Sequence, residues 1–364
     1  MREYVELGIG REARRTYHLD EVSVVPSRRT RSSKDVTTGW KLDAYELDNP
    51  FIAHPTDAVV SPDFAIEMDK QGGFAVLDAE GLLGRVEDID AAIEEITSAD
   101  NPTQVLQRLH QQPINMELLA SRLDAVRDAG ALVAVRVSPQ HARELAPAIK
   151  AHLLFIQGTV VSAEHVEKGG EPLNLKEFIG TLDTAVVVGG VSSYHTAKHA
   201  MRAGAVGVIV GSGETTNAAT VGIDVPMATA IADVAAARRD YLDETGGRYV
   251  TVIADGEIYS TGDAVKAIAC GADAVMLGMP LAQAAEAQAK GLYWEAAAAH
   301  PIFPRAEVIT VTDSEQAVSL EQVLHGPAEN PLGEINFVGA LKRAMGKCGY
   351  TDVKGFQRVE LNLV

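Results

Sequence analysis

The sequence predicts a closed (β/α)₈ barrel of the TIM type, and three observations lead to this prediction. Short apolar runs rich in Val, Ile and Leu recur eight times along the chain, as expected of parallel strands buried on both faces. Helical patterns lie between most of these runs. Several of the helices end on a glycine just before the next strand, which is the usual place of a C-terminal cap. Eight strands alternating with helices favour a closed barrel, and an open doubly wound sheet is the alternative.

The expected elements follow one another in a regular order. The strands are expected at 51–53, 74–77, 132–137, 153–157, 185–188, 207–210, 250–254 and 274–277. The clearest helical patterns cover 121–129, 194–203, 228–241 and 263–269. Three of these helices are followed by Gly130, Gly204 and Gly271.

The 364 residues are expected to form one domain with three segments. Residues 1–50 precede the first strand and are expected to cap the barrel, which extends over 51–290. Residues 291–364 form a flap-like segment and a closing helix at 339–346. After Gly278 the pattern indicates an alanine-rich helix and then a stretch containing several prolines.

Composition excludes several classes of partner. The formal net charge is −18 and the sequence pI is about 5.0, so the chain is repelled by nucleic acid and by anionic membrane surfaces. Its two cysteines, Cys270 and Cys348, do not have the spacing of a metal site or of a disulfide framework. The N-terminus has no signal-like apolar core, and no run has the length of a membrane helix. We therefore expect a cytoplasmic protein without a metal.

The loops after the last three strands are the candidate binding site, because a (β/α)₈ barrel binds ligands at this end and phosphates after strands seven and eight. Asp255 and Gly256 follow the seventh strand, and Gly278 follows the eighth. The Asp255 carboxylate is placed to accept hydrogen bonds from two ligand hydroxyls, although Asp-Gly is also an ordinary turn. Gly211 and Gly213 begin the sixth loop, which either cradles an anion or is purely structural.

Longer stretches of this sequence resemble a known family. VIADG at 252–256, STGD at 260–263 and CGADAVMLG at 270–278 are similar to the nucleotide-binding region of IMP dehydrogenases and GMP reductases. HLDEVSVVP at 18–26 and ALKRAMGKCG at 340–349 resemble the N-terminal signature and the closing helix of the same family. The resemblance covers nearly the whole chain.

The resemblance implies a function as well as a fold. Dehydrogenases of this family usually carry two CBS modules between the second and third strands, and the connection at 80–131 is too short for them. The chain is therefore similar to GMP reductases and, more closely, to IMP dehydrogenase-related proteins that lack CBS modules. The implied ligand is a purine nucleotide (IMP or GMP) or a nucleoside, and the implied cofactor is NAD or NADP. The family assembles as homo-tetramers or homo-octamers.

One departure from the family concerns the nucleophile. The family's sixth loop carries a cysteine that attacks the purine, and here Thr215 or Thr216 takes that place. A thiol ionises partly at neutral pH, whereas a threonine hydroxyl needs a neighbouring base. The resemblance thus implies either an oxidoreductase with an altered nucleophile or a catalytically inactive, purine-binding or regulatory relative.

The remaining expectations concern ligand contacts. By resemblance, the substrate-binding residues are Asp57, Gly211, Gly213, Asp255, Gly256, Gly278 and Tyr293. Glu257 stands where the family has a glycine and would repel a phosphate if its carboxylate faced one, so a ligand without a phosphate is a second hypothesis. Asp57 is either a site carboxylate or a loop cap. His54 is either a ligand contact or a histidine satisfied within the barrel.

Overall fold

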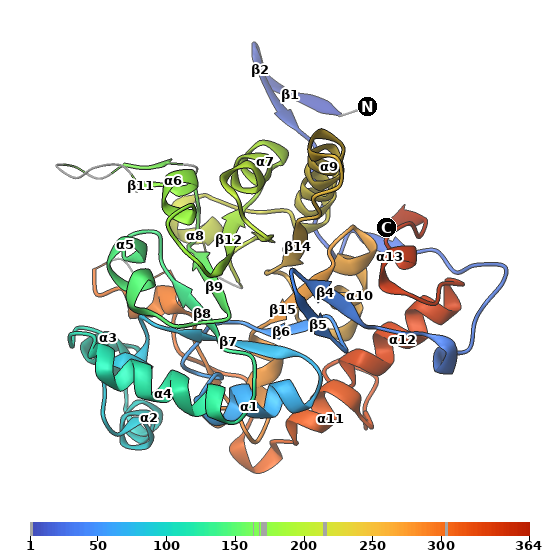
Figure 1. Ribbon diagram of the computed structural model, residues 1–364. Helices are drawn as coiled ribbons and strands as arrows, with labels where there is room; N and C mark the ends of the chain where they lie inside the picture. The colour runs from blue at the N-terminus through green and yellow to red at the C-terminus, as the bar shows by residue number, and fades with distance from the viewer. Residues whose placement is uncertain (1–2, 163, 167, 169–172, 214–216, 303–304) are drawn as a thin grey trace.

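Eight parallel strands close into a barrel in the computed structural model, which describes residues 3–162, 164–166, 168, 173–213, 217–302 and 305–364. Figure 1 shows the barrel strands surrounded by helices. Strand β15 pairs with β6 through Val275 and Phe51, and this pairing closes the ring. The barrel strands are β6 (Phe51–Ala53), β7 (Phe74–Asp78), β8 (Ala134–Val137), β9 (Leu153–Gln157), β12 (Ala185–Val191), β13 (Gly207–Val210), β14 (Thr251–Ala254) and β15 (Ala274–Leu277). The predicted closed barrel is confirmed and the open sheet is excluded.

The barrel interior is filled by large apolar side chains. Those of Ile52, Phe74, Phe155, Ile253 and Met276 belong to one fully buried cluster. They alternate with residues that face the surrounding helices, so each strand is apolar on both faces. Burial on both faces explains why continuous apolar runs located the strands.

A hairpin closes the barrel at the N-terminal ends of its strands. It consists of β4 (Trp40–Leu42) and β5 (Tyr45–Leu47). Trp40 and Leu42 belong to the interior cluster, and the indole Nε1 of Trp40 donates a 2.7 Å hydrogen bond to the Asn49 carbonyl. This end of the barrel is therefore sealed, and ligands have access from the opposite end.

The outer helices begin and end at recognisable caps. Ser193 and Ser260 each form a capping box at the start of α7 (Tyr194–Ala203) and α10 (Thr261–Ala269). Three of the outer helices are α1 (Pro62–Lys70), α4 (Met116–Asp128) and α9 (Met227–Thr245). Helix α1 packs against β7 and α4, and α9 packs against β13 and β14. Other helices between the barrel strands are α2 (Ile89–Ser98), α3 (Pro102–Leu109), α5 (Ala142–Leu145), α6 (Leu175–Ile179) and α8 (Asn217–Val221).

The two terminal segments pack together against the barrel. Strand β3 (Val22–Val24) pairs with β18 (Leu361–Leu363). The ring of Phe337 packs edge-on against that of Phe51, with 5.7 Å between the ring centroids. The C-terminal helices are α11 (Leu320–His325), α12 (Phe337–Lys347) and α13 (Val353–Phe356). Three further antiparallel strand pairs are β1 (Tyr4–Gly8) with β2 (Arg11–Arg14), β10 (Glu164–His165) with β11 (Leu173–Asn174), and β16 (Leu292–Tyr293) with β17 (Ile309–Thr310).

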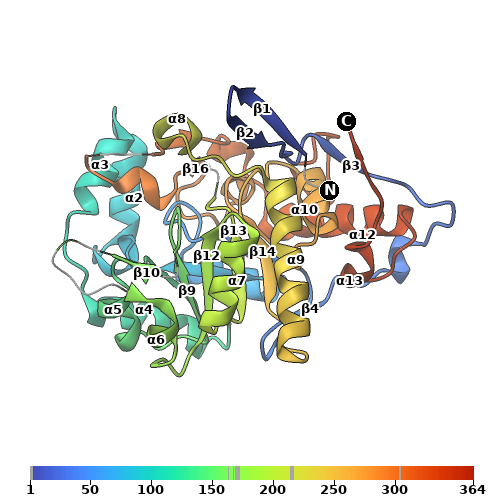
Figure 2. The same ribbon diagram turned by 90° about the horizontal axis from the view of Figure 1, so that it is seen from above.

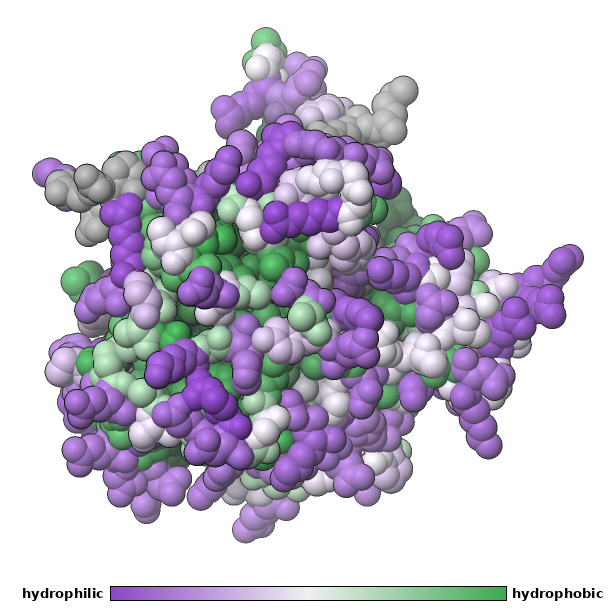
Figure 3. Space-filling model, viewed as in Figure 1, coloured by the Kyte–Doolittle hydropathy of each residue, from purple (hydrophilic) through white to green (hydrophobic). Residues whose placement is uncertain are grey.

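The views show how these parts are arranged. The β1–β2 hairpin projects from the body in Figure 1, and Figure 2 shows α8 and β16 at one end of the barrel with β4 at the other. In Figure 3 polar residues surround a paler, more apolar central area on the face turned to the viewer. No helix within the described parts of the chain is both long and apolar enough to cross a membrane.

The alanine-rich helix expected after Gly278 is a correction to the sequence analysis. The chain there forms 3₁₀ turns at Met279–Gln283 and Ala296–Ala299 with irregular backbone between them. Backbone N–H groups of Ala285 and Ala289 donate to the carbonyls of Val318 and Ala58, at 2.7 Å each. These tertiary hydrogen bonds replace the helical ones, so packing overrides the helix propensity of alanine.

Candidate active site at the barrel mouth

A cavity of about 800 Å³ opens at the C-terminal ends of the strands, which we call the barrel mouth. Ligand cavities in proteins commonly have such a volume. Five residues on its wall lie at or just after the ends of five different strands: His54, Asp78, Ser138, Gln157 and Ser212. A second hollow of about 480 Å³ lies at the opposite end, beside the β4–β5 hairpin. The mouth collects ionisable side chains from several C-terminal strand ends, as a barrel active site does.

Asp255, the residue after β14, has a carboxylate that is already held by two side chains. His54 Nδ1 lies 3.0 and 3.1 Å from its two oxygens. Gln157 Nε2 donates a 2.6 Å hydrogen bond to Oδ2. Asp255 is only 2% exposed. A carboxylate accepts only, so the ring nitrogen that faces it carries the proton. The His54 imidazole is thus hydrogen-bonded within the barrel, and Asp255 fixes its orientation. His54 is also part of the cavity wall.

Gln157 holds a buried hydrogen-bond acceptor in the wall of the cavity. Because its Nε2 donates to Asp255, the orientation of the amide is fixed and Oε1 must be the remaining polar atom. Oε1 is buried and has no hydrogen-bond partner among the residues that the structure describes. Gln157 itself is 4% exposed and lines the cavity. A buried acceptor without a partner is costly, so this atom is suited to receive a donor from a ligand.

The predicted glycines bring the last three loops of the mouth close together. The Gly213 N–H donates a 2.9 Å hydrogen bond to the Asp255 carbonyl, which joins the sixth loop to the seventh. A Cβ on Gly256 would lie 3.0 Å from the Gly213 carbonyl, and one on Gly211 would lie 2.2 Å from the Asp255 carbonyl. All three glycines also have positive φ values. The close contacts and the backbone conformation together favour glycine over any other residue at these three positions.

Tyr293 and Glu295 fill the space between these glycines and the eighth loop. A Cβ on Gly278 would lie 2.3 Å from the Tyr293 hydroxyl. That hydroxyl is 3.5 Å from Glu295 Oε1, to which it donates. A Cβ on Gly213 would lie 2.5 Å from the same Glu295 oxygen. We call Gly213, Gly256, Gly278 and Tyr293 the glycine cradle, and the Glu295 carboxylate lies between its members.

Glu257 faces away from the cradle, which answers the question left open by the sequence. Its backbone adopts a left-handed conformation, with φ at 57°. Its carboxylate accepts from the backbone N–H of Leu19 at 2.9 Å and pairs closely with His18 Nδ1. The hydrogen bond to Glu257 raises the pKa of His18 above its usual value, and Asp224 lies 3.5 Å from the other ring nitrogen. The carboxylate of Glu257 thus anchors the N-terminal segment.

Asp57 holds a neighbouring loop in place. Its Oδ1 accepts a 2.9 Å hydrogen bond from the Leu82 N–H, and its Oδ2 lies 3.0 Å from His110 Nε2. A Cβ on Gly81 would lie 2.1 Å from Oδ1, so the loop after β7 packs directly on this carboxylate. Both oxygens of Asp57 therefore serve the loop and His110, and His110 in turn lines the cavity.

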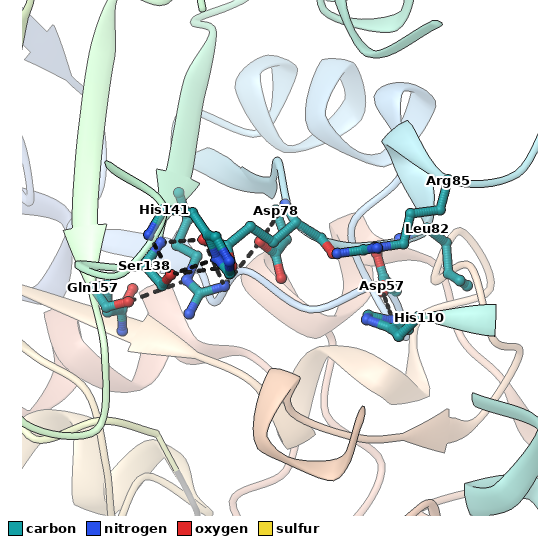
Figure 4. A network of polar contacts seen from close by, with 10 residues as sticks. Asp57, Asp78, Leu82, Arg85, His110, Ser138, His141 and Gln157 are labelled. Carbon is teal, nitrogen blue, oxygen red and sulfur yellow. Dashed lines mark hydrogen bonds and ion pairs between the residues drawn. The ribbon is translucent and has the colours of Figure 1, made fainter. Parts of the chain in front are cut away.

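A second polar network, which sequence reasoning missed, occupies the side of the mouth formed by β7 and β8 (Figure 4). Arg136 Nη1 donates a 3.1 Å hydrogen bond to Asp78 Oδ1 and lies 4.0 Å from Glu80 Oε1. His141 Nδ1 lies 2.7 Å from Glu80 Oε2. The Ser138 hydroxyl donates to the same Glu80 oxygen at 3.1 Å. A charged residue inside the apolar run at 132–137 was the signal that could have indicated this network.

The charges in this network shift one another's pKa values. Burial alone would raise the pKa of Glu80, but the hydrogen bond from His141, the charge of Arg136 and hydrogen bonds from Ser138 outweigh it and lower this pKa to about 2. The hydrogen bond to Glu80 in turn raises the pKa of His141. His141 therefore carries a proton at its Nδ1 that points at Glu80. The network is not a nucleophilic triad. The Ser138 hydroxyl donates to Glu80, and His141 Nδ1 carries a proton, so this nitrogen cannot accept the proton of the hydroxyl.

Both thiols lie away from the mouth. Cys270 is the C-cap of α10, four residues before the start of β15, and so belongs to the sealed end of the barrel. Burial raises its pKa to about 12. Cys348 is the C-cap of α12, and burial raises its pKa too. Neither thiol is a candidate nucleophile. Thr215 and Thr216, the predicted replacements for the family's cysteine, lie outside the described residues.

The fold and the mouth together define a (β/α)₈ barrel protein with a polar ligand site at the strand ends, and comparison with known proteins identifies its family. Residues 16–302 match the family described as "IMP dehydrogenase / GMP reductase domain". An "uncharacterized oxidoreductase" of Mycobacterium leprae is 57% identical over 98% of this chain and 99% of its own length. One of Mycobacterium tuberculosis is 55% identical over 99% of both chains.

A solved structure is similar over almost the same extent. The "IMP dehydrogenase/GMP reductase-like protein" of Corynebacterium glutamicum has a TM-score of 0.95 and 60% identity, and the match covers 99% of this chain and 98% of that one. This chain therefore belongs to the IMP dehydrogenase/GMP reductase family of oxidoreductases. The resemblance stated from its motifs is confirmed. The connection between β7 and β8 is described throughout and holds only a 3₁₀ turn (Leu82–Gly84) and helices α2 to α4, so no CBS module lies between these strands.

Proposed function

We propose that this protein is an NAD- or NADP-linked oxidoreductase that acts on a purine nucleotide or nucleoside without forming a cysteine adduct. Family membership supports the redox chemistry and the purine ligand. The position of the thiols supports a reaction without a cysteine adduct. Cys270 and Cys348 are both buried helix caps, and burial raises the pKa of each thiol. The chain has two cysteines, so a cysteine adduct at the mouth has no residue to form it.

The mouth offers groups that can move a proton while a hydride is exchanged. His141, held by Glu80, lies on the cavity wall with about half of its side chain exposed. An imidazole oriented by a carboxylate is a common general acid or base. In this proposal His141 gives or takes the proton of the reacting group. Thr215 or Thr216 holds the place that the resemblance gives to the nucleophile, and its hydroxyl hydrogen-bonds the ligand.

The cavity also fits a nicotinamide cofactor in size and charge. Its volume of about 800 Å³ is larger than a purine nucleoside needs. Arg85 and Arg305 lie on its wall, and guanidinium groups suit the phosphates of a dinucleotide. The bound nicotinamide would accept or donate the hydride, while the protein residues orient the ligand and exclude water.

A non-catalytic role is the second candidate, and one observation favours it. The Asp255 carboxylate, which the resemblance assigns to substrate binding, is already engaged by His54 and Gln157. A purine-binding or regulatory relative would keep the scaffold and bind ligands without turnover. Either role is compatible with a cytoplasmic homo-tetramer or homo-octamer. Exposed apolar side chains on the β1–β2 hairpin, with Leu7 69% and Ile9 105% exposed, favour such self-association.

A nicotinamide absorbance assay distinguishes the two candidates. The protein is mixed with NAD or NADP plus IMP or inosine, and with the reduced cofactors plus GMP, XMP or their nucleosides. We expect one pairing to give turnover that a Thr215→Ala, Thr216→Ala variant slows at least tenfold. Binding of a purine without any absorbance change would favour the non-catalytic role. A Thr215→Cys variant tests the loop assignment, because gain of activity would support it.

A further inference from the structure

The glycine cradle stands where a (β/α)₈ barrel receives a phosphate, and Glu295 already places a carboxylate there. The loops after the seventh and eighth strands are the common phosphate site of this architecture. In this chain Gly256 and Gly278 belong to those loops, and the Glu295 carboxylate lies against Gly213 and the Tyr293 hydroxyl. Glu295 is 3% exposed. The chain thus places its own carboxyl group in the cradle, on the cavity wall.

A phosphate would meet this carboxylate at close range. Two unit charges of the same sign about 4 Å apart weaken binding roughly five- to a thousandfold, depending on the effective dielectric. Space is also restricted, because the carboxylate and the Tyr293 hydroxyl approach within 2.5 Å and 2.3 Å of where a Cβ would stand on Gly213 and Gly278. A phosphate monoester would have to displace Glu295 in order to reach the glycines.

A second buried acceptor lies in the same part of the cavity. Gln157 Oε1 has no partner in the described part of the chain, and its orientation is fixed by the bond from Nε2 to Asp255. Gln157 and Glu295 both line the cavity, together with His54. A wall with a carboxylate and a fixed amide oxygen is complementary to hydroxyl or amino donors. It is poorly matched to a ligand group that only accepts hydrogen bonds, as a phosphate dianion does.

We infer that the part of the mouth lined by Gln157, Glu295 and the glycine cradle binds an unphosphorylated ligand through the hydroxyl or amino groups of that ligand. Glu295 takes the place that a phosphate would otherwise have. For the purine ligand this means the nucleoside and not the nucleotide, a step that rests on the proposed function. The exclusion of phosphate does not rest on it, because the argument uses only the Glu295 carboxylate, the cradle and Gln157.

The test measures binding by calorimetry for three proteins: the unaltered chain, Glu295→Gln and Glu295→Gly. The glutamine keeps the shape and removes the charge, and the glycine also opens the cradle. Glu315→Gln, which alters an exposed carboxylate, is the matched control. The ligands are inosine, guanosine and xanthosine, their monophosphates, and inorganic phosphate.

We expect the unaltered chain to bind a nucleoside at least fivefold more tightly than its monophosphate. Glu295→Gln should reduce or reverse this ratio, and Glu295→Gly should gain affinity for inorganic phosphate. Tighter binding of the monophosphate by the unaltered chain would overturn the inference, and so would a ratio that Glu295→Gln leaves unchanged. If no purine binds any of the proteins, the proposed purine ligand fails. Inorganic phosphate then decides the inference: a gain only in the Glu295 variants supports it, and equal binding by all proteins overturns it.

Discussion

Gln157 and Asp255 meet across the barrel mouth, where Nε2 of the glutamine donates a 2.6 Å hydrogen bond to Oδ2 of the aspartate. Gln157 ends β9 and Asp255 follows β14, so this contact spans the barrel between strands that are not neighbours. It fixes the orientation of the amide, whose oxygen is buried in the cavity wall. This hydrogen bond thus fixes which atom of the amide is left without a partner among the described residues.

Replacing Gln157 by leucine should destabilise the protein and weaken ligand binding. The change removes a buried donor to Asp255, and leaving such a partner unsatisfied costs about 1–3 kcal/mol. Urea unfolding measures the loss. Gln140→Leu is the control, because Gln140 lies on the same cavity but is exposed, and its replacement should change stability by less than about 0.5 kcal/mol. Equal stabilities of the two variants would contradict the role given to Gln157.

Glu80 should make the protein sensitive to acid. Its pKa is lowered from 4.5 to about 2 in the folded state, so the unfolded chain binds a proton at a higher pH than the folded one does. The stabilisation is therefore complete above pH 4.5 and is lost as the pH falls towards 2. A shift of this size corresponds to about 3 kcal/mol. Unfolding free energies measured over this range should fall more steeply for the unaltered chain than for Glu80→Gln.

His141 should titrate above the usual histidine range, since the hydrogen bond to Glu80 raises its pKa above 6.5. The stability that it contributes is present below pH 6.5 and is lost as the pH rises through the raised pKa. Nuclear magnetic resonance of the imidazole protons gives this pKa directly. In Glu80→Gln we expect it to fall towards the ordinary value. An unchanged His141 pKa in that variant would show that Glu80 does not hold the imidazole.

The cysteines should be dispensable for turnover. A thiol whose pKa is about 12, as at Cys270, contains almost no thiolate at neutral pH. We expect slow labelling of both cysteines by a maleimide in the native protein and fast labelling after unfolding in urea. The variant carrying both Cys270→Ser and Cys348→Ser should keep its activity within about twofold, provided that circular dichroism shows it folded. Loss of activity in a folded variant would contradict a cysteine-independent reaction.

The barrel itself was predictable because its physical signal is local. The eight predicted strands differ from the observed ones only at their ends, for example 132–137 against Ala134–Val137 for β8. Burial on both faces forces a continuous apolar run, and such a run is visible in the sequence. The alanine-rich helix after Gly278 was predicted wrongly for the converse reason. Backbone hydrogen bonds from that segment to Ala58 and Val318 decide its conformation, and no local pattern contains them.

The site was predictable in part. The sequence located the loops of the mouth, yet it left open where the Glu257 carboxylate points. The answer depends on His18 and Leu19, more than two hundred residues away. The Glu80–His141 network likewise joins residues from different strands and loops. Glu295 lies only two residues after Tyr293 in the sequence, but only the structure places its carboxyl group in the cradle.

The most direct test of the account is a thermal-shift titration of the unaltered protein with IMP, GMP, XMP and the corresponding nucleosides. A ligand present at a hundred times its dissociation constant stabilises the native state by about 2.7 kcal/mol, which raises the melting temperature measurably. We expect at least one purine to give this shift, with the nucleoside ahead of its monophosphate. No shift with any purine would contradict the assignment of a purine site to the barrel mouth.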